Sequence, residues 1–252
     1  MSTAALVLCG GQATRLRPLI QRLGYPASYP KQMMPIGKDR KPVLEHVLRL
    51  LLRHGLEDVV VVTKPDNEVI QDYFGDGSRF GARMAFHAQP FPAMGSADVV
   101  RDAYVNTDIR RYERILTYYG DIVSDLNIGA LLRKHSRSKA ALTLALSKEY
   151  RLQVVVPKMN ASGQISRVVA YPELRKVLSG GRSRTIVGVS IAENDTLALL
   201  EDLETEGMDF MGGFVPELLR RKKRVTGYVH RGYWVDVGTE ENYIVLTHRS
   251  VT

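Results

Sequence analysis

Cysteine is nearly absent from this chain, which has a single one, Cys9, among its 252 residues. One cysteine cannot form an intrachain disulfide, so a disulfide scaffold is excluded. Cys9 ends the apolar run Ala4–Cys9, and we interpret it as a reduced, buried thiol rather than a reactive nucleophile. The run is far too short to span a bilayer and no basic segment precedes it, so we expect a cytoplasmic protein with no membrane partner.

Repeats and linker-like low-complexity segments are missing as well. The composition, 44% hydrophobic and 25% charged with 21 glycines and 11 prolines, argues against disorder and against a collagen-like fibre. At roughly 100–200 residues per domain, the length predicts one large domain. Only a few residues follow His248, so we expect no further domain after it.

Acidic residues are outnumbered, because 35 Lys and Arg face 27 Asp and Glu for a formal net charge of +8. A basic surface favours anionic partners, which include nucleic acid, anionic lipid and phosphorylated metabolites. The one basic run, Arg220 to Arg224, is typical of a solvated helix end. No zinc-finger spacing or basic-aromatic stripe is present, so we predict no nucleic-acid partner.

Short β-branched runs alternate with longer amphipathic ones, which predicts an α/β fold with a mainly parallel sheet flanked by helices. The predicted strands are 5–9, 59–63, 83–87, 114–118, 141–146, 154–157, 165–169, 187–191 and 225–229. The predicted helices are 44–52, 96–104, 128–135, 196–203, 214–221 and 240–248. Residues 171–184 contain Pro172, Gly180 and Gly181, which predicts a mobile loop.

A glycine-rich turn, Gly10-Gly11, follows the first predicted strand, with Arg15 and Arg17 shortly after it. Glycines at a strand's carboxyl end bring backbone N–H groups close to an anion, and arginines supply bidentate positive charge. The segment is neither a dinucleotide-binding fingerprint nor a Walker loop. By itself it indicates either a phosphate site or a plain structural turn.

Three segments in order carry a family resemblance. They are Gly10-Gly11-x-x-Thr14-Arg15-Leu16, Pro30-Lys31-x-x-x-Pro35 and Lys41-Pro42-x-Leu44-Glu45-His46. Together they resemble the sugar-1-phosphate nucleotidyltransferases, and in particular glucose-1-phosphate thymidylyltransferases and mannose-1-phosphate guanylyltransferases. The similarity continues through Gln89 to Ala97, Tyr119-Gly120-Asp121 and Gly232 to Tyr243. It therefore runs from about residue 4 to residue 246.

The resemblance implies a Rossmann-like, GT-A-like nucleotidyltransferase domain over 1–252, with a nucleotide-binding half at 1–150 and a sugar-binding half with the closing motif at 151–252. It implies Mg²⁺-dependent transfer of a nucleotidyl group from an NTP to a sugar-1-phosphate, an EC 2.7.7 activity. Homo-oligomers occur among such enzymes, but no segment of this sequence marks an interface. A catalytically weak, nucleotide-sugar-binding regulatory homologue is the alternative.

The same resemblance assigns site residues. The catalytic ones would be Arg15, Lys31 and Asp121; the nucleotide-binding ones Gly10, Gly11, Thr14, Arg15, Gln32, Gln89 and Gly95; and the metal ligands Asp121 and Asp236. From the residues alone, a structural role is the alternative to metal binding: Asp121 would be a carboxylate in a turn after a strand, and Asp236 would form an ion pair with Arg231. The amides of Gln32 and Gln89 suit the imide edge of thymine or uracil, and also guanine, so we predict dTTP or UTP over GTP.

Three departures from the family pattern stand out. Ala13 replaces the usual glycine, and its β-carbon would crowd the phosphates or strain a positive φ angle. The usual sugar-contacting Glu-Lys-Pro is absent at Ala170-Tyr171-Pro172, which points to an unusual sugar or cyclitol phosphate; Arg175, Lys176, Arg182 or Arg184 would replace the lost lysine, or be solvated. The segment between Leu19 and Lys31 is lengthened, as a lid or as a longer surface loop.

Overall fold

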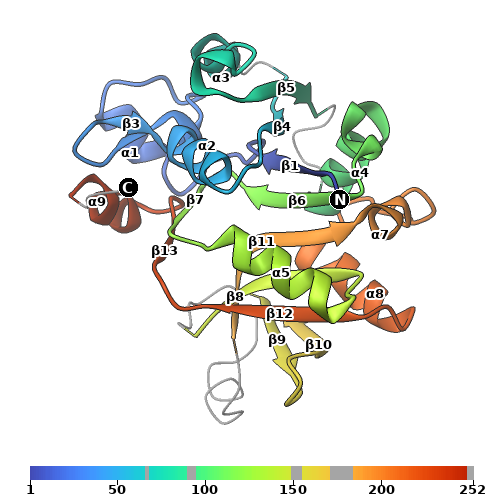
Figure 1. Ribbon diagram of the computed structural model, residues 1–252. Helices are drawn as coiled ribbons and strands as arrows, with labels where there is room; N and C mark the ends of the chain where they lie inside the picture. Colours follow the sequence, from blue (N-terminus) through green and yellow to red (C-terminus); the bar gives the residue numbers. More distant parts are fainter. Residues whose placement is uncertain (66–67, 90–94, 149–154, 171–183, 249–252) are drawn as a thin grey trace. The chain divides into compact units, whose positions relative to one another are not determined.

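The computed structural model describes residues 1–65, 68–89, 95–148, 155–170 and 184–248 (Figure 1). The chain forms two compact units, each built from separate stretches of sequence. The first unit contains 1–3, 93–117 and 127–231, and the second contains 4–92, 118–126 and 232–252. Residues 90–94 of the family-like segment Gln89 to Ala97 lie outside the described residues, as do residues 171–183 of the predicted loop, with Arg175, Lys176 and Arg182.

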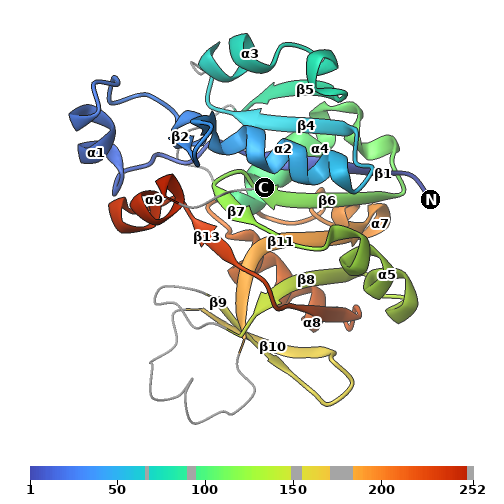
Figure 2. The same ribbon diagram turned by 60° about the vertical axis from the view of Figure 1, so that its left-hand side comes forward.

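Parallel strands form the centre of the second unit. Strand β1 (Thr3–Leu8) pairs with β4 (Asp58–Thr63), which pairs with β5 (Arg83–Ala88), both in parallel (Figure 2). The register sets Val7 beside Val61 and Val60 beside Ala85. β1 and β4 are continuous apolar runs because both faces of a parallel sheet are covered. The carboxyl ends of these strands therefore open onto one edge.

Helix α2 (Val43–Arg53) is the main helix of this unit. It buries Val47, Leu48 and Leu51 at three- and four-residue spacing, and Gly55, with a φ of +75°, follows its end. The other elements are α1 (Arg17–Arg22), η1 (Lys31–Met33), β2 (Pro35–Ile36), β3 (Lys41–Pro42), α3 (Glu68–Phe74), η2 (Ser78–Phe80), β7 (Ile122–Ser124), β13 (Trp234–Asp236) and α9 (Glu240–Thr247).

Strand β8 (Leu142–Ser147) lies at the centre of the first unit, parallel to β12 (Val225–His230) and antiparallel to β11 (Thr185–Glu193). A second antiparallel pair joins β9 (Val155–Met159) to β10 (Ile165–Ala170). The remaining elements are α4 (Ser96–Asn106), η3 (Asp108–Arg111), α5 (Ile128–Ser138), α7 (Asn194–Ala198), η4 (Phe210–Phe214) and α8 (Val215–Arg220). Strand β6 (Arg114–Tyr119) is divided between the units after Thr117.

The predicted α/β class with mainly parallel strands is confirmed. One predicted helix was placed wrongly: of residues 196–203, only those up to Ala198 are helical, in α7, which begins at Asn194. The predicted helix 214–221 is confirmed as α8, and a π-helical turn from Phe210 precedes it. That turn starts early because the Asp209 side chain accepts a hydrogen bond from the Gly212 N–H, which caps it. The short elements α1, α3, β7 and β13 have too few residues to show periodicity, and sequence patterns missed them.

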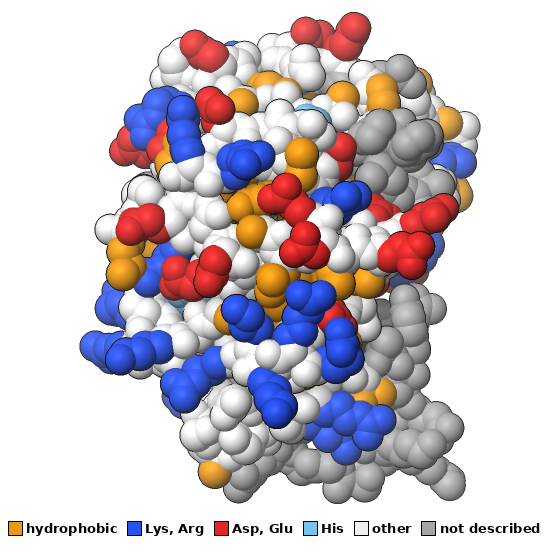
Figure 3. Space-filling model, turned by 90° about the vertical axis from the view of Figure 1, so that its right-hand side faces the viewer, with side chains coloured by type: hydrophobic (Ala, Val, Ile, Leu, Met, Phe, Trp, Pro, Cys, Tyr) orange, Lys and Arg blue, Asp and Glu red, His pale blue; other side chains and the backbone are white. Residues whose placement is uncertain are grey.

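Charged side chains are unevenly placed on the surface. On the face drawn in Figure 3, Lys and Arg side chains gather in the lower part, with few acidic ones among them. Of the basic run, Arg220 and Arg221 both pair with Glu217 on helix α8. Among the described residues, no helix is long and apolar enough to cross a membrane.

Candidate active site

The glycine-rich turn follows β1 directly, at the carboxyl edge of the second unit's sheet. Gly10 is buried, and a β-carbon there would lie 2.1 Å from Gln89 Oε1, so only glycine allows this packing. Gly11 is exposed, and a β-carbon there would meet only Lys31 Cε at 3.9 Å. The backbone at Gly11 is therefore open to an approaching ligand.

Ala13 has a φ of +52°, the left-handed conformation that glycine adopts without strain. The turn thus keeps a backbone conformation suited to glycine, and the β-carbon of Ala13 makes this conformation strained. Thr14 and Arg15, next in the turn, are both exposed. Arg17 begins α1 and its Nη2 donates to the Gln12 carbonyl at 3.3 Å, so its guanidinium returns towards the turn.

Lys31 stands in the short helix η1, and its side chain forms an ion pair with Asp121. Both side chains are largely buried, with 12% and 16% of their surface exposed. Burial alone lowers the pKa of the Lys31 ammonium, but Asp121 and Asp236 outweigh it and hold the pKa above its usual value. Lys31 is therefore a fixed positive charge at this edge.

Asp121 and Asp236 come together through the antiparallel pair β7–β13. Asp236 lies opposite Ile122, and the Val237 N–H donates to the Asp121 carbonyl at 2.9 Å. The pKa of Asp236 is raised to about 6, mainly by burial and then by the neighbouring charge of Asp121, while the charges of Lys31 and Arg15 oppose the shift. The Oδ1 atom of Asp236 is buried and has no hydrogen-bond partner among the described residues.

Gly238, two residues after Asp236, lies against the side chains of Asp236 and Arg15. A β-carbon at Gly238 would stand 2.8 Å from Asp236 Oδ1 and 3.0 Å from Arg15 Nη2. Arg15 is thereby placed beside the carboxylates although it comes from a distant turn. Gly238 was not among the predicted site residues, although its place directly after Trp234-Val235-Asp236-Val237 could have indicated it.

Gln32 and Gln89 are buried polar residues of the same unit. Gln32 has 1% of its surface exposed, and neither of its side-chain amide atoms has a hydrogen-bond partner among the described residues. Leaving such an amide unpaired costs free energy, which a polar ligand group would recover. Gln89 covers Gly10, and its N–H donates to the Thr63 carbonyl at 2.9 Å.

Gly95 belongs to the first unit, where it caps helix α4. Its N–H donates to Asp98 Oδ2 at 3.1 Å, and a β-carbon there would stand 2.2 Å from the Met208 carbonyl oxygen. A close backbone approach therefore requires glycine at this position. The other predicted site residues all belong to the second unit.

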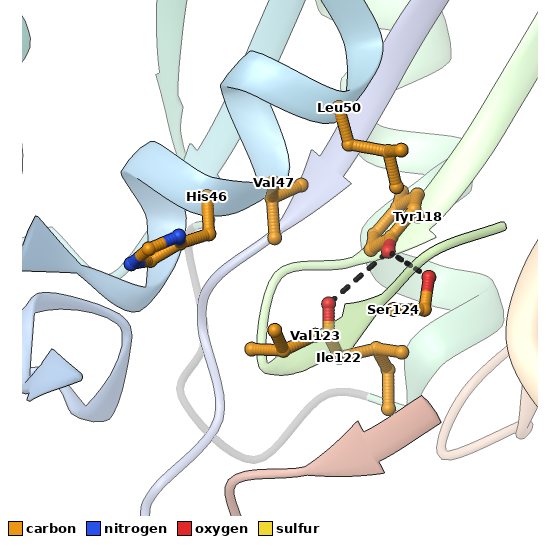
Figure 4. A pocket seen from close by; sticks show the side chains of 7 residues that line it. All are labelled: His46, Val47, Leu50, Tyr118, Ile122, Val123 and Ser124. Atoms are coloured by element: carbon orange, nitrogen blue, oxygen red, sulfur yellow. Dashed lines mark hydrogen bonds between the residues drawn. The ribbon is translucent and has the colours of Figure 1, made fainter. Parts of the chain in front are cut away.

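A separate small depression of the second unit holds none of these groups. Figure 4 shows it between helix α2 and the turn into β7, where the Tyr118 hydroxyl donates to the Ile122 carbonyl and bonds Ser124, each at 3.1 Å. Its lining residues are His46, Val47, Leu50, Tyr118, Ile122, Val123 and Ser124. Among the described residues, no group of three or more His, Cys, Asp or Glu forms a ready metal site.

A family model described as nucleotidyl transferase matches residues 4–250 of this chain. The chain belongs to the nucleotidyl transferase family. The resemblance found in its motifs is thereby confirmed.

Members of the nucleotidyl transferase family with curated names cover 95% of this chain. A mannose-1-phosphate guanylyltransferase from Mycobacterium tuberculosis is 29% identical, and this chain spans 62% of its length. A D-glycero-alpha-D-manno-heptose 1-phosphate guanylyltransferase from Aneurinibacillus thermoaerophilus is 28% identical, and this chain spans 94% of its length. A UTP–glucose-1-phosphate uridylyltransferase from Synechocystis is 25% identical, and this chain spans 61% of its length.

The fold is also that of solved family structures. A crystal structure of a candidate glucose-1-phosphate thymidylyltransferase from Bacillus anthracis superposes with a TM-score of 0.82 at 17% identity, covering 98% of this chain and 94% of that one. The match extends over almost the whole chain and bears on the fold alone.

Proposed function

We propose that this protein transfers a nucleotidyl group from an NTP to a sugar-1-phosphate and releases pyrophosphate. The observation that carries the proposal is the buried Lys31 held against Asp121 and near Asp236, beside the open backbone of Gly11. Relatives of this chain carry names of guanylyl- and uridylyltransferases that act on sugar phosphates.

In the reaction a phosphate oxygen of the sugar-1-phosphate attacks the α-phosphorus and forms a new P–O bond. The bond between the α-phosphorus and the bridging oxygen breaks, and pyrophosphate leaves with the bonding electron pair. Two anions must approach each other, so positioning and charge neutralisation supply most of the catalysis. Lys31 would neutralise charge between the α-phosphate and the attacking phosphate, and Arg15 would neutralise the leaving group. Gly10, Gly11 and Thr14 would hold the triphosphate.

The carboxylates fit a divalent cation. Oxygen ligands from carboxylates and phosphates are those that Mg²⁺ prefers, and the buried Asp236 Oδ1, which has no hydrogen-bond partner in the part of the chain that the structure describes, would gain one in a cation. Asp121 and Asp236 would therefore hold Mg²⁺, which when bound supplies positive charge to the phosphates. A proton competes for Asp236, whose pKa is raised to about 6.

The base pocket would include Gln32 and Gln89, whose amides both donate and accept hydrogen bonds. The side-chain amide of Gln32, which no other described residue hydrogen-bonds, supports base binding. We propose dTTP or UTP as the nucleotide, with GTP as the competing outcome because two of the relatives are guanylyltransferases. By the resemblance, Gly95, which caps α4, would also contact the nucleotide.

The altered sugar motif favours an unusual sugar or cyclitol phosphate. We also propose a cytoplasmic location, with which the single free, buried Cys9 is in keeping, because the cytoplasm is reducing.

Two measurements test this function. A thermal-shift series with dTTP, UTP, GTP, CTP and ATP plus Mg²⁺ identifies the base, since a ligand at about 100 times its Kd adds roughly 2.7 kcal/mol of stability. Pyrophosphate release is then measured with that NTP and a panel of sugar-1-phosphates and cyclitol phosphates. Binding without pyrophosphate release across the panel favours the regulatory homologue instead.

The Lys31→Ala variant tests the centre of the site. We expect kcat to fall by about 10²–10³, because the lost charge acts mainly in the transition state. Because the replacement leaves Asp121 without its cation, circular dichroism is needed to show that the variant is folded. Turnover close to that of the unmodified protein would remove Lys31 from the mechanism.

A further inference from the structure

Lys64 lies beside the phosphate turn, although none of the family-like motifs contains it. It follows β4 directly, and β4 is the parallel neighbour of β1, with Val62 paired to Leu8. The Cys9 N–H donates to the Val62 carbonyl at 2.7 Å, which continues this pairing up to the turn. Residue 64 therefore leaves the sheet at the same edge as Gly10 and Gly11.

Positive charge is concentrated around this edge. Burial lowers the pKa of Lys64, and the neighbouring charges of Arg17 and Lys31 lower it further, so the three cations interact. Arg17 donates to the Gln12 carbonyl at 3.3 Å, and Lys31 Cε is 3.9 Å from the β-carbon position of Gly11. Three cations thus surround the phosphate turn, where their like charges repel one another and a bound anion would relieve the repulsion.

We propose that Lys64 binds the β- and γ-phosphates of the NTP and stabilises the pyrophosphate as it leaves. This inference rests on the proposed function and adds a residue to it. Lys31 is held by Asp121, and its pKa is also affected by Asp236 and Arg15. On the other side of β1, the Gly120 N–H donates to the Leu8 carbonyl at 3.0 Å, so Lys64 leaves the sheet on the side of β1 opposite to Asp121. That side suits the tail of the triphosphate, whereas the attacking phosphate belongs near the carboxylates.

The test compares Lys64→Gln with Lys38→Gln. Lys38 is an exposed lysine of the same unit, and its replacement makes the same change in net charge without touching the turn. Calorimetry in the presence of Mg²⁺ measures the affinities for inorganic pyrophosphate, UTP, UMP, GTP and GMP. None of these titrations requires turnover or knowledge of the sugar.

We expect Lys64→Gln to lower the affinity for pyrophosphate, and for whichever of UTP and GTP the protein binds, by about tenfold or more. The replacement deletes a charged hydrogen-bond donor to these phosphates. The monophosphates should bind within about twofold of the unmodified protein, because they lack the phosphates that Lys64 contacts. Lys64→Arg should restore most of the pyrophosphate affinity. Without ligand, Lys64→Gln should melt at the same temperature or slightly higher, because the repulsion among the cations is relieved.

The role of Lys64 would be overturned if Lys64→Gln lowered the affinities for monophosphates and triphosphates equally. It would also be overturned if Lys64→Gln and Lys38→Gln changed the pyrophosphate affinity equally. A lower melting temperature for ligand-free Lys64→Gln with unchanged pyrophosphate affinity would overturn it too, because that result indicates a structural role. If the unmodified protein binds pyrophosphate through Lys64 but releases no pyrophosphate from any NTP in the presence of any sugar-1-phosphate, the proposed function fails and the role of Lys64 in phosphate binding stands.

Discussion

Position 13 carries a β-carbon in the turn that would hold the phosphates. Ala13 has a φ of +52°, and an L-residue in the left-handed region costs about 1–2 kcal/mol relative to the right-handed one. The sequence predicted this conflict from the missing glycine. The structure shows that the turn accepts the strained conformation instead of changing shape.

Ala13→Gly is therefore expected to improve nucleotide binding. Removal of the β-carbon should lower the nucleotide KM by about fivefold, which corresponds to roughly 1 kcal/mol, with kcat nearly unchanged. Stability should change little, because the relief of strain is offset by about 0.4–1 kcal/mol of added unfolded-state entropy. Steady-state kinetics and a thermal melt check both expectations. A higher KM in the glycine variant would show that Ala13 contributes a favourable contact.

Gly238 is a second position where one carbon atom matters. Gly238→Ala would push on Asp236 Oδ1 and Arg15 Nη2, at 2.8 and 3.0 Å from the new β-carbon. We expect kcat to fall by about 10²-fold, because a shift of about 1 Å in a catalytic group has that effect. The exposed Arg15 can move, so the melting temperature should fall only slightly. Unchanged kcat would mean that the Asp236 carboxylate need not stay where it is.

At the scale of elements, helix α5 ends on a residue poorly suited to its backbone. Lys139 is its C-cap, with φ and ψ both at 46°, a conformation that usually belongs to glycine. Lys139→Gly should raise the free energy of unfolding by about 1 kcal/mol relative to Lys139→Ala, which removes the same charge but keeps the β-carbon. Urea denaturation of the two variants measures the difference. Equal stability would show that the neighbouring chain relaxes around the alanine.

Elements with many residues could be predicted, whereas short ones could not. Helix α2 and strands β1 and β4 show clear apolar spacing and were predicted nearly to their ends. Strands β7 and β13 have three residues each, too few for a pattern, yet their pairing brings Asp121 and Asp236 together. The lengthened segment after Leu19 contains the end of helix α1 and a stacked Tyr25–Tyr29 pair, with 4.4 Å between the ring centroids, and both pack on the buried core.

At the scale of the whole molecule, stability should depend on pH through His135. This fully buried ring lies 2.8 Å from Thr143 Oγ1 and 3.0 Å from Glu193 Oε1. Burial lowers its pKa and Arg114 acts in the same direction, against the opposing charge of Glu193. The folded state therefore takes up this proton at lower pH than the unfolded state, and the associated stability is lost as pH falls below about 6.5.

Melting temperatures of the unmodified protein and of His135→Gln between pH 7.5 and 5 test this dependence. The decline on acidification should be smaller in the variant, whatever its absolute stability. An NMR titration of the His135 ring in the unmodified protein provides an independent check. A ring that titrates at or above its ordinary pKa would contradict the expectation.

By itself the sequence determined the α/β class, the order of the long elements and the family, because apolar periodicity and the glycine, lysine and aspartate motifs are local features. It also indicated that Lys31, Asp121 and Asp236 belong to one site, through the resemblance. Only the tertiary structure brought Lys31 onto Asp121, 90 positions away, placed Gly238 against Asp236 and Arg15, and placed the end of β4, which Lys64 follows, beside the phosphate turn. Such contacts depend on which strands pair and in what register, and these long-range pairings leave no mark on the residues that they bring together.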